Sequence, residues 1–202
     1  MAFDILASDE AIVKTVAALA ANGIATIVVE NGEAAKRKVL ELVPEGAEVM
    51  TMSSVTLDII GLLKELNESG KFAPIRAKFK AMDRKTQGSL MQKMGAGPDW
   101  AIGSVHAVTE DGHVLIASAT GSQLPAYAYG SSHVVWVVGA QKIVRDSDEG
   151  MRRIYEHCLP LEDARARKVY GIGSGVNKVL TINKEVQAGR ITMVIVKEKL
   201  GF

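Results

Sequence analysis

The chain has 202 residues, enough for one α/β domain with a substantial core and only marginally enough for two. Its 24 Lys and Arg residues against 23 Asp and Glu give a formal charge of +1 with no long block of one sign, which argues against nucleic-acid and membrane-surface partners. Cys158 is the only cysteine, which excludes an intrachain disulfide and a cysteine-rich metal site and fits a reducing cytoplasm.

The N-terminal part of the chain alternates between helical and strand patterns. Its first residues are acidic where a secretory signal would need basic ones, so we expect a soluble, unexported protein. Ser8 is placed to cap a helix, and residues 25–29 then read as a buried strand. Asn31 can cap a second helix, and residues 48–52 read as a second strand. The alternation predicts parallel strands with helices packed on both faces.

Ser53 and Ser54 follow this second strand directly and begin a helix whose apolar residues extend to Leu66. They could cap that helix, or their hydroxyls and the free N–H groups behind them could bind an anion. The region 71–98 interrupts this alternation of helices and strands. It is basic and rich in methionine, with helical stretches around residues 75–82 and 89–94. We expect it to be a mobile or partner-facing insertion.

A hairpin with an acidic tip is predicted after residue 99. Asp111-Gly112 between alternating runs is a two-residue turn signal, because a type I′ turn needs positive φ at both central residues. Glu110 would then face His113 across the turn. His106 would face Ala117, on the same face of the first arm as Glu110.

Glu110 is the candidate catalytic residue, with His106 tuning its carboxylate. A carboxylate held beside an imidazole can act as a nucleophile or as a general base. The alternative is an exposed hairpin end stabilised by an ion pair between glutamate and histidine.

The turn formed by Thr120, Gly121, Ser122 and Gln123 follows the second arm and opens a helix predicted over 122–129. Its backbone N–H groups and the positive end of the helix could hold a phosphate or a carboxylate, or the hydroxyls could simply cap the helix. Ligands of open parallel sheets gather outside the carboxyl ends of the strands, where both this turn and Ser53-Ser54 should lie.

The remaining chain reads as a strand at 133–138, two helical segments within 147–170 split at Pro160, and β-rich runs at 178–183 and 190–197. The glycine-rich stretch 171–178 follows a helix and leads into a strand, the reverse of a nucleotide-binding loop, so it is interpreted as a helix end and connector. No spacing of His and Cys residues indicates a metal site, and no cofactor is expected.

The chain is identified by resemblance as a single-domain member, over residues 1–202, of the LUD (lactate utilisation) family. The resemblance is strongest in residues 100–143 and 159–196, including Leu159-Pro160-Leu161-Glu162-Asp163 and Gly189-Arg190-Ile191-Thr192. It implies a three-layer, Rossmann-like α/β fold with a mostly parallel sheet and an inserted β-hairpin. That fold is similar to those of ribose-5-phosphate isomerase, glucosamine-6-phosphate deaminase and the CoA transferases.

The resemblance also implies a function in lactate or related organic-acid utilisation in the cytoplasm. Relatives similar to lactate utilisation protein C work beside separate subunits that carry iron–sulfur clusters, and they read Ala-Glu-Thr-Gly where this chain has Thr109-Glu110-Asp111-Gly112. CoA transferases of the same fold place a nucleophilic glutamate in a similar Glu-Asn-Gly turn.

We therefore expect an accessory or catalytic component that binds a small anionic metabolite: a carboxylate, a CoA ester or a sugar phosphate. The alternatives are a free-standing enzyme using Glu110, either acyl-CoA transferase-like or sugar-phosphate isomerase-like, and a non-enzymatic metabolite sensor. Assembly into an oligomer is left open.

Overall fold

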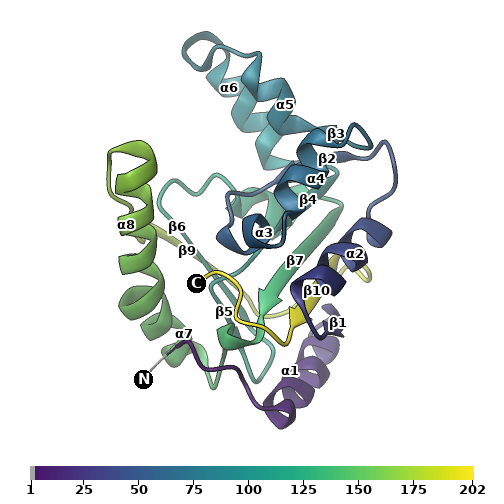
Figure 1. Cartoon of the computed structure of the whole chain (residues 1–202), viewed down its shortest axis with the longest axis vertical. Coiled ribbons are helices and arrows are strands. Elements are labelled where there is room, and N and C mark those ends of the chain that lie inside the picture. The colour runs from purple at the N-terminus through teal and green to yellow at the C-terminus, as the bar shows by residue number, and fades with distance from the viewer. Residues whose placement is uncertain (1–2) are drawn as a thin grey trace.

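The computed structural model describes residues 3–202 and is built around a parallel sheet of six strands. All neighbouring strands of this sheet pair in parallel, as the alternating sequence pattern predicts. Across the sheet (Figure 1) the order is β1 (Ala25–Val29), β10 (Ile191–Val196), β7 (His133–Gly139), β4 (Trp100–Gly103), β2 (Glu48–Thr51) and β3 (Ala73–Pro74).

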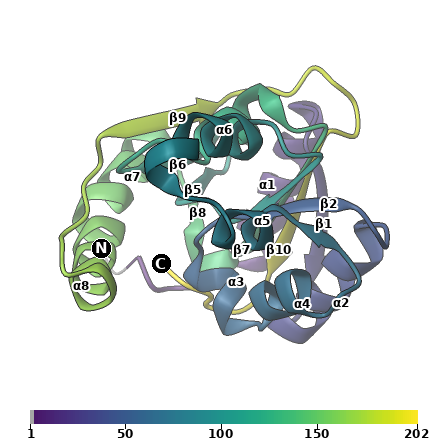
Figure 2. The ribbon, with the colours of Figure 1, turned by 90° about the horizontal axis from the view of Figure 1, so that it is seen from above.

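Helices cover both faces of this sheet, which confirms the Rossmann-like layered architecture. On one face lie α2 (Gly32–Leu42), α3 (Val55–Ile59) and α4 (Leu62–Glu68), and on the other lies α1 (Asp9–Ala21), as Figure 2 shows. The central strand β7 serves both cores because its side chains alternate. Val135 and Val137 pack with α2–α4, whereas Trp136 and Val138 pack with α1.

A second sheet shares the face that carries α1. Its order is β8 (Ile143–Val144), β5 (Ala107–Thr109), β6 (Val114–Ser118) and β9 (Lys178–Ile182), and the predicted hairpin is its β5–β6 unit. Val108, Val114 and Ile116 face the main sheet and join its core. Ala107 and Leu115 point the other way, against α7 (Ser147–Arg153) and the π-helical turn η3 (Ile154–Cys158), which continues into α8 (Leu159–Tyr170).

Predicted helix starts are confirmed by their caps. The side chains of Ser8, Asn31 and Ser54 each accept a hydrogen bond from a backbone N–H in the first turn of α1, α2 and α3. Short polar side chains at these positions satisfy N–H groups that the helix itself leaves open.

Three predicted elements need correction. The strand at residues 25–29 is at the edge of the sheet and only partly buried, not enclosed. The helix predicted from Ser53 to Leu66 is broken at Gly61, whose φ of +67° separates α3 from α4. The helical region 147–170 is interrupted by η3 rather than by Pro160, which lies in the first turn of α8.

The remaining elements lie around the carboxyl ends of the strands of the main sheet. Residues 71–98 supply β3, α5 (Ile75–Lys80) and α6 (Arg84–Ala96), and α6 extends away from the sheet in Figure 1. The predicted helix at 122–129 is a π-helical turn, η1 (Ala126–Gly130), and β7 ends in the short 3₁₀ turn η2 (Ala140–Lys142). Within residues 3–202, no helix has the length and apolar character needed to cross a membrane.

Candidate functional site

The acidic hairpin has a three-residue loop, so the predicted two-residue register is wrong by one residue. Ala107 pairs with Leu115, and the backbone N–H of Thr109 donates to the His113 carbonyl at 2.9 Å. Only glycines adopt positive φ in residues 3–202, so Asp111 cannot take its place in a type I′ turn. Gly112, at φ +83°, instead closes a turn with a bulge.

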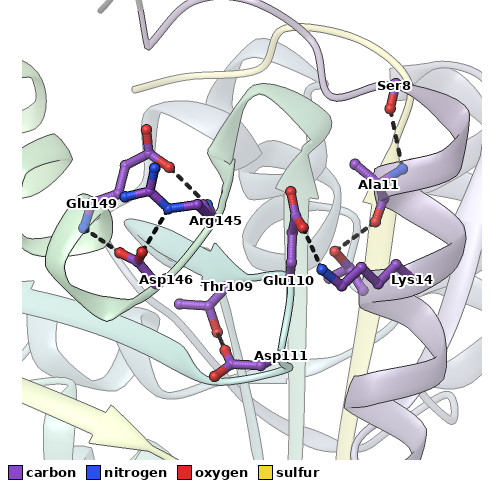
Figure 3. Close-up of polar contacts among 10 residues, drawn as sticks. Ser8, Ala11, Lys14, Thr109, Glu110, Asp111, Arg145, Asp146 and Glu149 are labelled. Carbon is purple, nitrogen blue, oxygen red and sulfur yellow. Dashed lines mark hydrogen bonds and ion pairs between the residues drawn. The ribbon is translucent and has the colours of Figure 1, made fainter.

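This register takes Glu110 away from histidine and towards α1. Its backbone N–H donates to the Val144 carbonyl at 2.9 Å, and its carboxylate accepts a hydrogen bond from Lys14 at 2.8 Å, as Figure 3 shows. Asp111 accepts from the Thr109 hydroxyl, and its other carboxylate oxygen lies 3.7 Å from His113 Nδ1. Glu110 is therefore held by a lysine of α1, and the expected pair with His113 does not form.

His106 lies at the other end of β5 from Glu110, about 13 Å along an extended strand. Its Nδ1 accepts from the Ala117 N–H at 3.1 Å, which leaves the ring proton on Nε2. The ring is only partly exposed, and burial lowers its pKa to about 3, with the charges of Lys142 and Arg153 acting in the same direction. His106 is thus a neutral imidazole that does not contact Glu110.

The turn from Thr120 to Gln123 uses two of its backbone N–H groups in local hydrogen bonds. The N–H of Gly121 donates to Ser118 Oγ at 2.8 Å, and the N–H of Ser122 donates to Thr120 Oγ1 at 3.3 Å. The Gln123 amide donates to the Ala117 carbonyl. These contacts favour the capping interpretation, and anion binding by this turn stays a prediction.

The same turn lies at the far end of β6 from the acidic loop, about 15 Å away along the strand. The structure therefore separates Glu110, the candidate catalytic residue, from the turn that was the candidate anion site. The turn instead begins beside His106, because the Ala117 N–H contacts that ring. A catalytic role for Glu110 also stays a prediction.

Ser53 and Ser54 follow β2 at the carboxyl edge of the parallel sheet. Ser54 caps α3 through the N–H of Leu57, whereas the exposed Ser53 accepts a hydrogen bond from Arg76 Nη2 at 3.1 Å. Arg76 Nε also donates to the Thr51 carbonyl at 2.5 Å. Two hydrogen bonds therefore join Arg76, in the first turn of α5, to the end of β2 and to Ser53 directly after it.

Arg76 also lines an open pocket of about 310 Å³ between α3, α4 and α5. Burial lowers its pKa, but a guanidinium stays charged in proteins. Of its five N–H groups, two are used, and it forms no ion pair among the described residues. The other charged lining residues are Lys64, Lys80, Asp58 and Glu68.

Two buried cations, Lys142 and Arg153, were missed by the sequence interpretation. Lys142 is 1% exposed, and its Nζ donates to Thr56 Oγ1 (3.0 Å), Ser104 Oγ (3.0 Å) and the Val105 carbonyl (3.2 Å). Arg153 is fully buried, and in residues 3–202 its Nε and Nη2 have no partner. Neither residue pairs with a carboxylate in that part of the chain. The position of Lys142 directly after an apolar strand was the available signal, and nothing in the sequence marked Arg153.

Lys142 and Arg153 lie near the point where β2, β4 and β7 end. Tyr127, from η1, places its hydroxyl in the space that a side chain at Gly103 would fill, and Arg153 of α7 donates to the His106 carbonyl. Such π-helical turns as η1 and η3 are often found at functional sites. No group of three or more potential metal-binding side chains occurs in residues 3–202.

A family model described as LUD domain matches residues 12–199. The chain belongs to the LUD domain family. A solved structure of a DUF162 family protein from Deinococcus radiodurans is similar over 95% of this chain and 99% of that one, with a TM-score of 0.58 and 13% identity. This confirms the fold of the LUD chain.

A second solved structure, eIF2B beta from Chaetomium thermophilum, is 15% identical with a TM-score of 0.37, covering 58% of this chain and 44% of its own. Similarity at that level concerns only part of each fold. Among curated proteins, none matches the LUD chain.

Proposed function

We propose that this LUD protein binds a small anionic metabolite where its parallel strands end, as a component of cytoplasmic lactate or organic-acid utilisation. The proposal rests on one observation: Arg76 combines a fixed position, three unused N–H groups and a place in the lining of an open pocket. A guanidinium held in place is suited to bidentate binding of a carboxylate or phosphate.

The place of this arginine in the fold supports the proposal. Ligands of open parallel sheets bind outside the carboxyl ends of strands, and Arg76 is anchored to the last residue of β2. Lys64 and Lys80 add positive charge to the pocket wall, while Asp58 and Glu68 keep the charge mixed. A small ligand with one or two negative charges suits this balance better than a polyanion.

The test is a binding screen with L-lactate, pyruvate, acetyl-CoA and ribose 5-phosphate, by calorimetry and thermal shift. We expect at least one of these anions to bind, with an affinity that falls as salt is added. Arg76→Met should weaken that binding about tenfold to a hundredfold, since charge-assisted hydrogen bonds contribute about 1.5–3 kcal/mol.

Lys78→Met is the matched control. Lys78 lies on the same helix but is paired with Glu48 and does not line the pocket, so this variant should bind as the wild type does. The proposal fails if none of the four anions binds, or if Arg76→Met binds as tightly as Lys78→Met. Copurification with an iron–sulfur protein would place the chain among accessory subunits.

A further inference from the structure

Lys142 and Ser104 lie side by side at the carboxyl ends of two neighbouring strands. Lys142 ends η2, directly after β7, and Ser104 follows β4, which pairs with β7. Their Nζ and Oγ atoms are 3.0 Å apart. The lysine is 1% exposed, whereas the serine residue is partly exposed.

Lys142 Nζ has three hydrogen-bond acceptors, and the Ser104 hydroxyl also lies 3.5 Å from the Val105 carbonyl as a donor. The Val105 carbonyl can only accept. The Thr56 hydroxyl donates its own proton to the Leu200 carbonyl at 3.1 Å, so it accepts from Lys142. A neutral amine has two N–H groups and one lone pair, and these two acceptors use both N–H groups. The charged amine directs its third N–H to Ser104 Oγ, and once that proton is lost the lone pair faces the Ser104 hydroxyl instead.

The surroundings favour that neutral amine. No carboxylate pairs with Lys142 in residues 3–202, and burial lowers its pKa to about 7. Arg153 at the end of α7 lowers the pKa further, while the Cys158 thiol of η3 opposes this. His106 also faces this cluster and is kept neutral by burial.

We propose that Ser104 and Lys142 form a nucleophile and general-base pair that accepts an acyl group from an ester or thioester. Serine with a desolvated lysine as its base is an established alternative to serine with histidine. Thr56 orients the amine, because its hydroxyl is fixed by the Leu200 carbonyl on one side and by Lys142 on the other.

The transfer of the acyl group to Ser104 needs no added oxidant or reductant. The Ser104 oxygen forms a bond to the acyl carbon as its proton passes to Lys142 Nζ. The bond from the acyl carbon to the sulfur or oxygen of the leaving group then breaks. The leaving group takes the proton from Lys142 and departs as a free thiol or alcohol. Water, or the hydroxyl of a second acceptor, then attacks the acyl carbon as its proton passes to Lys142, and Ser104 leaves by taking that proton back.

This inference deepens the proposed function and rests on it only for the negative charge of the substrate. Ser53 and Ser104 follow adjacent strands, about 5 Å apart in a sheet, and the Met52 N–H donates to the Ile102 carbonyl at 2.8 Å. An anion at Arg76 would therefore leave a neighbouring acyl group close to Ser104. A neutral probe tests the pair without the anion.

The experiment treats the purified full-length chain with an uncharged alkyl fluorophosphonate and follows labelling by mass spectrometry. We expect one adduct, on Ser104, formed at a rate that rises between pH 6 and pH 8 as Lys142 loses its proton. Ser104→Ala should abolish the adduct. Lys142→Met should slow its formation about a hundredfold or more, the usual contribution of a general base. Ser69→Ala, at an exposed helix end, is the control.

Several outcomes would overturn the proposal: no adduct on wild-type Ser104 between pH 5 and pH 9, a rate that does not change with pH, or equal labelling of a folded Lys142→Met variant. If Lys142→Met does not fold, as judged by its melting, the pH profile of the wild type decides. Arg76→Met separates the two proposals, because it should lose anion binding while Ser104 is still labelled.

Discussion

Arg190 illustrates what this chain does with a buried cation of structural importance. Its Nη1 pairs with Glu185 at 2.6 Å, its Nε donates to the Ser131 carbonyl, and its Nη2 donates to the carbonyls of Ala126 and Tyr127. A carboxylate and three carbonyls thus compensate its burial, as buried charges require. Lys142 and Arg153 have no such carboxylate among the described residues, which sets them apart as candidates for chemistry.

Replacing Arg190 by lysine should lower the free energy of unfolding by about 2–3 kcal/mol, because a single ammonium cannot replace the planar fork of hydrogen bonds. Urea denaturation measures the loss. Arg152→Lys is the control, since Arg152 of α7 forms an exposed pair with Glu156 of η3 and should change stability by less than about 0.5 kcal/mol. Equal effects of the two substitutions would show that the burial of Arg190 is of little consequence.

At the scale of elements, the hairpin loop is fixed against α1 by a glycine. Gly112 has φ +83°, and a Cβ built there would lie 2.7 Å from the Ala18 carbonyl carbon and 2.8 Å from the Leu19 nitrogen. These are backbone atoms of a helix and cannot move aside. Asn22 of the same helix end also donates to the carbonyls of Asp111 and Gly112. The loop and α1 are therefore expected to lose stability together.

Gly112→Ala should destabilise the protein by about 2–4 kcal/mol, the sum of the left-handed backbone penalty and of overpacking. Gly46→Ala separates the two contributions, because Gly46 has φ +78° with no atom within 4 Å of a built Cβ. It should cost about 1–2 kcal/mol. If both variants melt at the same temperature, the close approach to α1 contributes nothing.

The elements also show where sequence reasoning was sufficient. Capping side chains, apolar periodicity and terminating glycines act within a few residues, so Ser8, Asn31 and Ser54 were assigned correctly. Asp111-Gly112 is compatible with two loop lengths, and contacts with α1 decide between them. The cluster around Lys142 depends on which strands are neighbours, and the sequence does not encode that order locally.

At the scale of the whole molecule, the two sheets enclose titratable groups whose effect on stability should become measurable at acid pH. His106 follows β4 and precedes β5, so it lies where the chain passes from one sheet to the other. Its Nδ1 accepts from the backbone of β6, and its neighbours Lys142 and Arg153 come from η2 and α7. Protonating this imidazole would add a third positive charge to a site without a carboxylate partner in residues 3–202.

Acid stability should consequently depend on His106. An unfolded chain protonates this ring below about pH 6.5, whereas the folded chain, with the His106 pKa lowered to about 3, does not. Between these values the unfolded state binds more protons, so the free energy of unfolding falls as pH falls. His106→Asn retains an acceptor for the Ala117 N–H but cannot be protonated. From pH 6.5 to pH 4 the wild type should lose about 3 kcal/mol more stability than this variant.

Urea denaturation across this pH range measures the difference, and the slope is informative even if His106→Asn is less stable at neutral pH. His133→Asn is the matched control, because His133 is an exposed histidine stacked on Trp100 and its loss leaves the junction of the sheets intact. Parallel stability curves for the wild type and His106→Asn would show that the ring is protonated in the folded protein. Burial beside Lys142 and Arg153 would then not be what keeps His106 neutral.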